Sequence, residues 1–326
     1  MANNATVSKI SSLGASGPGQ LLMANGWDPQ CLRDNSVLRK DEWIEFDTAL
    51  VPIARQRLRG VNDLISAGLT LTLGNGMGTT ILQWEEVSDM DDADVSMDGV
   101  TRGVHDRVRF DINNLPIYIV HKDFHVNLRN LESSRRLGIP IDTTQIEVAT
   151  RKVADQVESI LFNGTSLTFG GNSVFGYRTA TNRNTFVIDP LWGAASGAQI
   201  VTDVIDMIAA AQADNMFGPY VLYMGVNYWN LLLDDYKAES DKSIIGRMKE
   251  LEGISAVRVA DVLPVDQVLL VQMTKDVVDL VIGMQPRVVQ WDVEGGFQTN
   301  FKVLTILVPR MKNDFDNRSG IVHGAA

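Results

Sequence analysis

The longest regular pattern of apolar residues in this chain lies between positions 142 and 163, where they recur every three or four residues. Asp142 can cap the start of a helix, Gln145 can complete a capping box, and Gly164 can end the helix in a left-handed conformation. The pattern predicts a helix of about 20 residues, roughly 30 Å long. Its apolar stripe needs a sheet or another helix to cover it, and comprises Ile146, Ala149, Val153, Val157, Ile160 and Leu161.

A second helical region is predicted over residues 37–66, interrupted by Pro52. Its apolar residues recur at helical spacing: Trp43, Phe46, Leu50 and Ile53. This stripe is either a face packed against the core or a contact surface for a partner. Residues 1–36 are rich in Asn, Ser and Gly and show no period, so they predict an arm that is either free or laid over a neighbouring subunit.

Residues 67–115 predict a long β excursion. Leucines alternate with threonines over 69–73, and further strands are predicted at 81–87 and 104–112. The Gly-Asn-Gly-Met-Gly run at 74–78 is a turn cluster, and it is not a phosphate loop because no Gly-Lys-Ser/Thr follows it. The excursion has too few large apolar residues to bury itself, which indicates that it leans on another surface.

An acidic cluster lies within this excursion: Asp89, Asp91, Asp92 and Asp94, with Asp98 further on. Several carboxylates in one place can bind Ca²⁺, but the glycine and the terminal glutamate of the helix-loop-helix calcium loop are missing. The alternatives are a calcium site and a solvated or salt-bridged loop, and the missing residues favour the loop.

The rest of the chain alternates helices with strands. A strand over 115–131 leads into an arginine-rich loop, a helix is predicted over 200–215, and Asn227 is expected to cap a helix over 228–235. Further strands are predicted at 184–190, 220–224, 257–262, 268–272, 277–282 and 301–308. An alternation that ends in β hairpins predicts an α+β fold instead of a doubly wound parallel sheet.

Composition narrows the classes of function. The 326 residues include 29 Lys and Arg against 40 Asp and Glu, a net charge of −11. Such a chain is a poor candidate for binding nucleic acid through its phosphates. It can still enclose nucleic acid, because a wall that binds its contents weakly is then an advantage. Cys31 is the single cysteine, which excludes a disulfide within one chain and fits a reducing cytosol. No apolar run reaches the ~18 residues of a membrane span, and no secretory signal pattern opens the chain, so we expect a protein that is soluble and cytosolic when made.

No motif in the sequence names a catalytic residue. The patterns Gly-x-Ser-x-Gly, His-Glu-x-x-His, Cys-x-x-Cys and Gly-x-Gly-x-x-Gly are all absent. His121 and His125 lie on a predicted strand, where four residues separate them by ~13 Å, too far to share one metal ion. The sequence therefore assigns no catalytic residue, no cofactor and no metal site.

The order of the parts is more informative than any one motif. The arm and the helical region come first, then the acidic β excursion closing on Leu115-Pro116, then the long helix ending in Phe162-Asn163-Gly164. An α+β region with Gly218-Pro219-Tyr220 follows, and the chain closes on Leu307-Val308-Pro309-Arg310 and on residues 319–324. This series resembles the major capsid proteins of tailed bacteriophages, in the branch shared with encapsulin shells, over nearly the whole chain after residue 36.

The resemblance implies a domain organisation. Its expected segments are an N-terminal arm 1–36, an N-terminal helix region 37–66, an extended loop 67–115, a peripheral domain 116–195 with spine helix 142–163, an axial domain 196–286, and a return to the peripheral domain over 287–326. It also implies that the extended loop lies over a neighbouring subunit and that the axial domain packs around fivefold and sixfold axes.

The resemblance further implies a structural function without enzyme activity or cofactor. Many copies would form hexamers and pentamers of an icosahedral virion capsid that encloses double-stranded DNA, assembled in the cytoplasm of the host bacterium. The acidic balance fits, because a basic wall would bind the packaged DNA. Separate scaffolding, portal and cement proteins are further candidate partners. Residues expected to contact neighbouring subunits are Trp84, Asp89, Asp91, Asp92, Asp94, Arg107, Arg109, Arg129, Arg135 and Arg136.

Two features of relatives can be compared with this sequence. Some relatives crosslink the subunits of the shell covalently, through an isopeptide bond from a lysine of the extended loop to an asparagine. No lysine occurs from Asp41 to His121, so we expect no such crosslink. Others carry a long cleavable scaffolding segment ahead of the arm, whereas only residues 1–36 precede the first predicted helix. We therefore expect assembly with a separate scaffolding protein or with none.

Two alternatives remain. The first is an encapsulin-type compartment that holds a cargo enzyme; the helix at 37–58 resembles such shells most, and in them it faces inward and helps to bind cargo. The Gly/Ser/Asn-rich arm departs from that pattern, because such shells generally lack one. The second, from a different class, is a cytosolic enzyme, which a stable monomer that forms no particle would favour.

Overall fold

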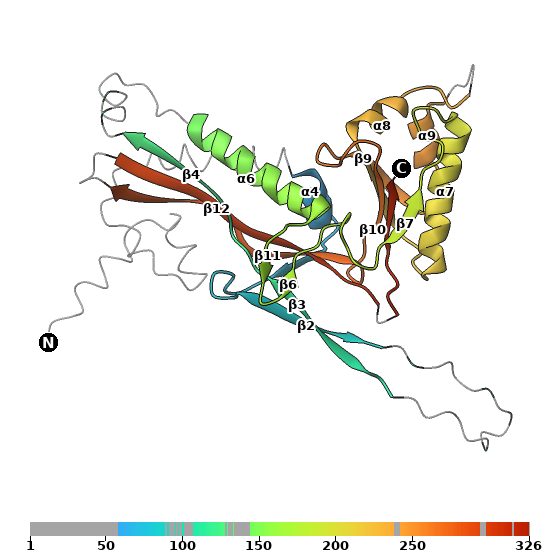
Figure 1. The fold of residues 1–326 in the computed structure, drawn as a ribbon, viewed down its shortest axis with the longest axis horizontal. Helices are drawn as coiled ribbons and strands as arrows, with labels where there is room; N and C mark the ends of the chain where they lie inside the picture. The colour runs from blue at the N-terminus through green and yellow to red at the C-terminus, as the bar shows by residue number, and fades with distance from the viewer. Residues whose placement is uncertain are drawn as a thin grey trace.

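Two β-sheets, each with helices against it, divide the described chain into two domains that lie side by side (Figure 1). In the computed structural model the described residues are 58–325, except 89, 91–94, 96, 98–99, 101–106, 128, 130–132, 134–143, 238–241, 294–297 and 315. The expected N-terminal arm, most of the helix region 37–66 and the predicted cap Asp142 lie outside them.

The sheet of the first domain has four strands, with α6 (Thr144–Asn163) along one face of it (Figure 1). β1 is parallel to β11, and the other neighbours are antiparallel. The order across the sheet is β1 (Thr70–Thr72), β11 (Val278–Val293), β12 (Gln298–Met311) and β4 (Val120–Asn127).

The predicted spine helix is confirmed as α6. All six residues of its predicted stripe are buried, because β4 and β12 cover that side of the helix. The helix ends as predicted at Gly164, which has a φ of 73° and donates its N–H to the carbonyl oxygen of Ile160 at 2.8 Å.

The strands β11 and β12 are much longer than the predicted 277–282 and 301–308. Register shifts flank Met284 in β11, so the alternation of apolar and polar positions breaks while the pairing continues. The turn cluster 74–78 packs against this irregularity: a Cβ on Gly76 would lie 2.3 Å from the Cα of Gly283. Two glycines are therefore needed for this close approach of backbones.

The second domain is a five-stranded sheet with α7 (Gly197–Ala213) on the side away from the first domain (Figure 1). Two short helices, α8 (Val226–Leu231) and α9 (Ile244–Lys249), complete it. The sheet order is β7 (Asn184–Val187), β13 (Ile321–Ala325), β10 (Val268–Gln272), β8 (Tyr220–Met224) and β9 (Ile254–Val259). Every residue of β8 and β10 is buried, so both faces of the central strands are covered.

The sheets divide the chain differently from the expected segments. Residues 287–326 were expected to return to the first domain, but β13 pairs with β10 in the second sheet, with Ile321 opposite Val271. β7 belongs to the second sheet, although its residues fall in the expected peripheral segment. β11 belongs to the first sheet, although it begins at Val278, within the expected axial segment. Pairing between distant strands leaves no local signal in the sequence, so the resemblance alone set these boundaries.

Several shorter predictions need correction. The strand predicted at 104–112 is β3 (Phe110–Pro116), whose bounds follow from its pairing with β2 (Ile81–Val87). Asn227 does not cap α8, because the cap is Gly225. The strand predicted at 257–262 is β9, three residues earlier. The bounds predicted for β2, β8 and β10 are confirmed.

The start of α7 was predicted too late, at Ile200, because its capping box was overlooked. The Ser196 hydroxyl accepts the Gln199 N–H at 3.4 Å, and the Gln199 side-chain oxygen accepts the Ser196 N–H at 2.8 Å. Ser196→Ala is expected to lower the free energy of unfolding by about 1 kcal/mol. Urea unfolding measures this, with exposed Gln212→Ala at the other end of α7 as the control. Equal losses for the two variants would contradict the role of the box.

Glu158 on α6 is buried and caps α4 (Arg59–Ser66). Its Oε1 accepts the Gly60 N–H at 2.6 Å and its Oε2 accepts the Val61 N–H at 3.4 Å, so the carboxylate satisfies two groups that have no partner within the helix. Burial raises the pKa of Glu158 to about 7, outweighing these hydrogen bonds, which lower it. The contact fixes α4 against the spine helix.

Asp63 of α4 in turn joins the two domains. The Tyr223 hydroxyl of β8 donates to Asp63 Oδ2 at 3.0 Å, and Arg258 Nη2 of β9 lies 3.6 Å from Asp63 Oδ1. Tyr223 also packs edge-on against Phe162 of α6, with ring centroids 5.1 Å apart. The end of the spine helix therefore rests on the second sheet.

Candidate assembly surface

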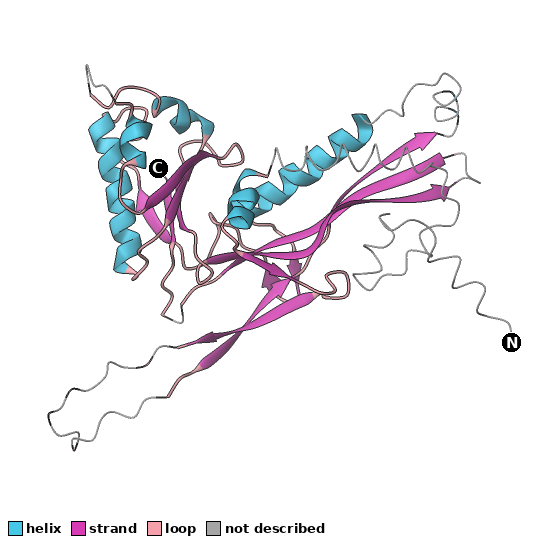
Figure 2. Ribbon diagram, turned by 180° about the vertical axis from the view of Figure 1, so that it is seen from behind, coloured by secondary structure: helices cyan, strands magenta, loops and turns pink. Residues whose placement is uncertain are grey.

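The antiparallel hairpin of β2 and β3 extends away from both sheets (Figures 1 and 2). Its register places Ile81 opposite Pro116 at the base and Val87 opposite Phe110 at the outer end. Residues directly opposite one another in an antiparallel pair project to the same face, and successive residues alternate. The hairpin therefore has two faces that can be assigned residue by residue.

The inner face of the hairpin packs against the first domain. It carries Leu82, Trp84 and Leu115, of which Leu115 is buried and the other two are partly buried against the core. The contact reaches as far as Trp84, whose ring lies beside the Arg310 guanidinium of β12. The inner face thus attaches only the base of the hairpin to the body.

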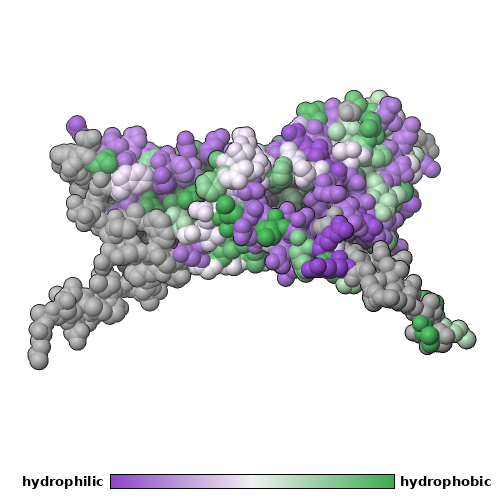
Figure 3. Space-filling view, turned by 60° about the horizontal axis from the view of Figure 1, so that its bottom comes forward, coloured by the Kyte–Doolittle hydropathy of each residue, from purple (hydrophilic) through white to green (hydrophobic). Residues whose placement is uncertain are grey.

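The outer face becomes apolar where the body no longer covers it. At its base, Gly170 between β5 (Thr168–Phe169) and β6 (Asn172–Ser173) lies against Ile81. Further out, an apolar strip consists of Val87, Phe110 and Ile112, which are 47%, 62% and 63% exposed. Hydrophobic surface is also visible at the end of this projection (Figure 3).

An isolated two-stranded hairpin is at best marginally stable in water. Burying a Val, Ile or Phe side chain contributes about 1.5–3 kcal/mol, and the apolar strip offers three such side chains. No part of the described chain supplies that burial. The strip is therefore a surface suited to another molecule.

The residues predicted to contact a neighbour are only partly described. Arg107, Arg109 and Arg129 are exposed, whereas Trp84 is partly buried against its own chain. The structure brings Arg107 and Arg109 next to the outer end of the hairpin. Outside the described residues lie Asp89, Asp91, Asp92, Asp94, Arg135 and Arg136. Phe110 and Ile112 were not among the residues predicted to contact a neighbour, although their alternation with polar residues was noted and the excursion was expected to pack against another surface.

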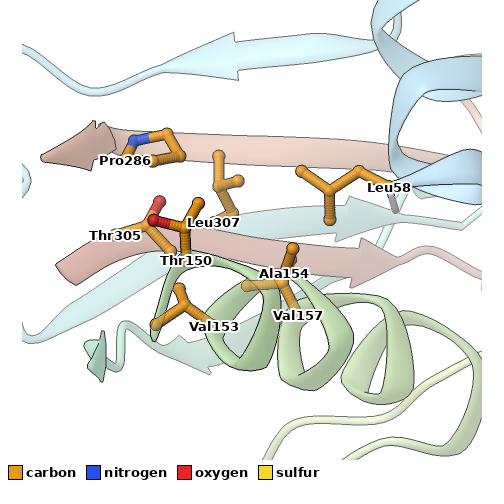
Figure 4. Close-up of a pocket in the computed structure, with 8 residues that line it drawn as sticks. All are labelled: Leu58, Thr150, Val153, Ala154, Val157, Pro286, Thr305 and Leu307. Carbon is orange, nitrogen blue, oxygen red and sulfur yellow. The ribbon is translucent and has the colours of Figure 1, made fainter. Parts of the chain in front are cut away.

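A small cavity between α6 and the strands β11 and β12 offers no chemistry (Figure 4). The residues around it include no titratable group: Leu58, Thr150, Val153, Ala154, Val157, Pro286, Thr305 and Leu307. Thr150 Oγ1 is buried without a hydrogen-bond partner, and Thr305 Oγ1 donates to the Met284 carbonyl oxygen at 2.9 Å. Such a cavity is a packing defect and not a substrate pocket.

The described residues form neither a metal site nor a membrane-spanning helix. Among the described residues, no three His, Cys, Asp or Glu side chains come together to hold a metal ion. His121 and His125 both lie on β4, as predicted, and His121 Nδ1 is 3.5 Å from Asp123 Oδ1. None of the described helices is long and apolar enough to cross a bilayer.

The fold is that of tailed-phage capsids and encapsulin-like shells. The capsid of Myoviridae phage XM1 matches with a TM-score of 0.63 over 79% of this chain and 90% of that chain, at 10% identity. The virus-like particle from Pyrococcus furiosus matches with a TM-score of 0.64 over 86% of this chain and 98% of that chain, at 17% identity. The α+β capsid fold predicted from the sequence is therefore confirmed.

The chain belongs to a family of unknown function, DUF6260, whose model matches residues 33–324. It is also similar to the diheme-cytochrome-encapsulin shell fusion protein of Kuenenia stuttgartiensis, at 26% identity over 196 residues. That match covers 60% of this chain and 51% of the relative, so the chain spans about half the length of that protein.

Proposed function

We propose that this protein is a structural shell subunit, many copies of which assemble into an icosahedral capsid that encloses phage double-stranded DNA. The observation that carries the proposal is the apolar strip on a hairpin that projects from a capsid fold. In a shell, the strip of each copy is buried against one neighbouring copy, and the strip of another neighbour is buried against that copy.

The same arrangement supports a role without enzyme activity. The cavity around Thr150 has no titratable lining residue, and the sequence lacks Gly-x-Ser-x-Gly, His-Glu-x-x-His, Cys-x-x-Cys and Gly-x-Gly-x-x-Gly. The net charge of −11 suits a wall that encloses DNA without binding it tightly, since phosphate binding requires positive charge. The particle would form in the host cytoplasm and persist as the virion capsid.

An encapsulin-type compartment is the second candidate function, and a specific observation favours it. The Kuenenia stuttgartiensis relative is an encapsulin shell fusion protein and is 26% identical over 196 residues, whereas the phage XM1 capsid is 10% identical. In that case the enclosed cargo is protein instead of DNA. The apolar strip has the same role in both candidates, because both require copies to bind one another.

Electron microscopy of the purified chain, expressed alone and then together with candidate scaffolding, portal and cement proteins of a phage, tests the proposal. Closed particles are expected, and the ratio of nucleic-acid to protein absorbance in the same fraction separates the two candidates. Particles filled with DNA support the capsid. Uniform small shells filled with protein support the compartment. A chain that remains monomeric in both expressions contradicts both.

The particle is expected to lack covalent crosslinks between its chains, because no lysine lies between Asp41 and His121. Denaturing electrophoresis of assembled particles should show one band at 35.9 kDa. A ladder at multiples of that mass would contradict this expectation.

A further inference from the structure

We propose that Trp84, Arg310 and Asp279 form a joint that fixes the direction in which the hairpin leaves the first domain, and through it the diameter of the shell. The three residues come from β2, β12 and β11, which meet at the base of the hairpin. The part of the proposal that concerns diameter rests on the proposed function.

The ionic half of the joint is held rigidly by the sheet. Asp279 and Arg310 are directly opposed on β11 and β12, and their side chains are only 6% and 9% exposed. Arg310 Nε donates to Asp279 Oδ1 at 2.8 Å, while Arg310 Nη2 donates to Oδ2. Lys312 Nζ lies 2.8 Å from the same Oδ2. A guanidinium held by both carboxylate oxygens has a fixed plane, because the bidentate fork permits little rotation.

The guanidinium carbon of Arg310 lies over the Trp84 ring, 5.3 Å from the ring centroid. This distance is within the range of a cation–π contact, and the contact is strengthened where water is excluded. The hairpin is therefore tied to the body through an oriented contact as well as through apolar packing.

Trp84 is the outermost residue by which the inner face contacts the body. The next position on that face, Glu86, accepts a hydrogen bond from Asn113 Nδ2 at 2.6 Å, within the hairpin itself. Val87 and its partner Phe110 lie three residues beyond Trp84, about 10 Å along the strand. A tilt of the hairpin about Trp84 therefore displaces the apolar strip.

The direction of the strip decides how one copy is rotated relative to the next. When identical subunits contact one another through different surfaces, the assembly closes only if the repeated rotation returns to the first subunit. A loose joint permits several rotations, so it permits several particle sizes. A fixed joint selects one.

The first test measures the joint within a single copy, so it does not depend on assembly. Nitroxide labels are placed at exposed Arg109→Cys and Lys152→Cys in a Cys31→Ser background, and the labelled chain is diluted into unlabelled chain. Pulsed electron spin resonance is expected to give a narrow distance distribution for the otherwise unchanged chain. Trp84→Leu and Arg310→Met are expected to broaden it at least twofold, while Trp84→Phe keeps it narrow. A narrow distribution for Trp84→Leu overturns the joint.

The second test is the distribution of particle diameters by electron microscopy. Trp84→Leu is expected to give mixed diameters or tubes, and Trp84→Phe uniform particles. If Arg310→Met does not fold, Arg310→Lys takes its place in the distance measurement, because lysine keeps the positive charge but cannot make the bidentate contact with Asp279. If Trp84→Leu broadens the distances but the unchanged chain forms no particles in either expression, the shell function is overturned and the joint stands. Uniform wild-type diameters from Trp84→Leu overturn the link to shell size.

Discussion

Phe110→Asp is expected to abolish particle formation at concentrations where the unchanged chain assembles. Phe110 is 62% exposed in the single chain, so its loss changes the free energy of unfolding by only about 0.5 kcal/mol. In a particle the same ring is buried, which contributes about 1.5–3 kcal/mol per contact. Since 1.4 kcal/mol is a factor of ten, the concentration required for assembly is expected to rise by roughly 10–100-fold or more. Light scattering against concentration measures that threshold.

Phe110→Leu is the matched control for this variant, because it keeps an apolar side chain at the same position. It is expected to assemble within about threefold of the unchanged threshold, as one apolar side chain replaces another. Circular dichroism of both variants checks that the chain remains folded. Assembly of Phe110→Asp at the unchanged threshold would show that the apolar strip is not an interface.

Glu158→Gln is expected to make the chain more stable at pH 8, with a several-fold smaller gain at pH 5. Burial raises the pKa of Glu158 from 4.5 to about 7, and the charge of Asp63 adds to the rise. Between these values the folded chain holds a proton that the unfolded chain has lost. The stabilisation is complete below pH 4.5, falls progressively as the pH rises from 4.5 to 7, and is lost above 7. The difference amounts to at most about 3 kcal/mol, at 1.36 kcal/mol per pKa unit.

Urea unfolding of the unassembled chain between pH 5 and pH 8 measures this effect as a difference between Glu158→Gln and the unchanged chain. Subtraction removes the contribution of the other carboxylates. Exposed Glu252→Gln is the matched control, because it changes the charge by the same amount at the surface. It is expected to shift the whole curve without changing its slope. A Glu158→Gln curve parallel to that of the unchanged chain would show that Glu158 is ionised throughout.

The spine helix was predictable because its information is local. Six apolar residues at helical spacing define the buried face, and Gly164 marks the end of the helix. The strands β2, β8 and β10 were predictable for the same reason, since each is a short run bounded by turn residues. The β11–β12 pair was predicted too short because the irregularity near Met284 disrupts its alternation.

Contacts between distant residues account for what the sequence could not predict. Glu158 caps a helix whose first N–H groups lie 98 residues away. β13 reaches the second sheet by pairing with β10, and nothing in Ile-Val-His-Gly-Ala selects that sheet. The apolar strip was visible as an alternation in the sequence, but an alternating strand that faces the core has the same pattern as one that faces a neighbour.

The most direct test of the shell function is a cryo-electron microscopy map of the assembled particle. The map is expected to show the hairpin of one copy lying on another copy, with Phe110 and Ile112 buried between them. A particle in which the hairpin lies against its own chain, or in which the apolar strip faces solvent, would contradict the account.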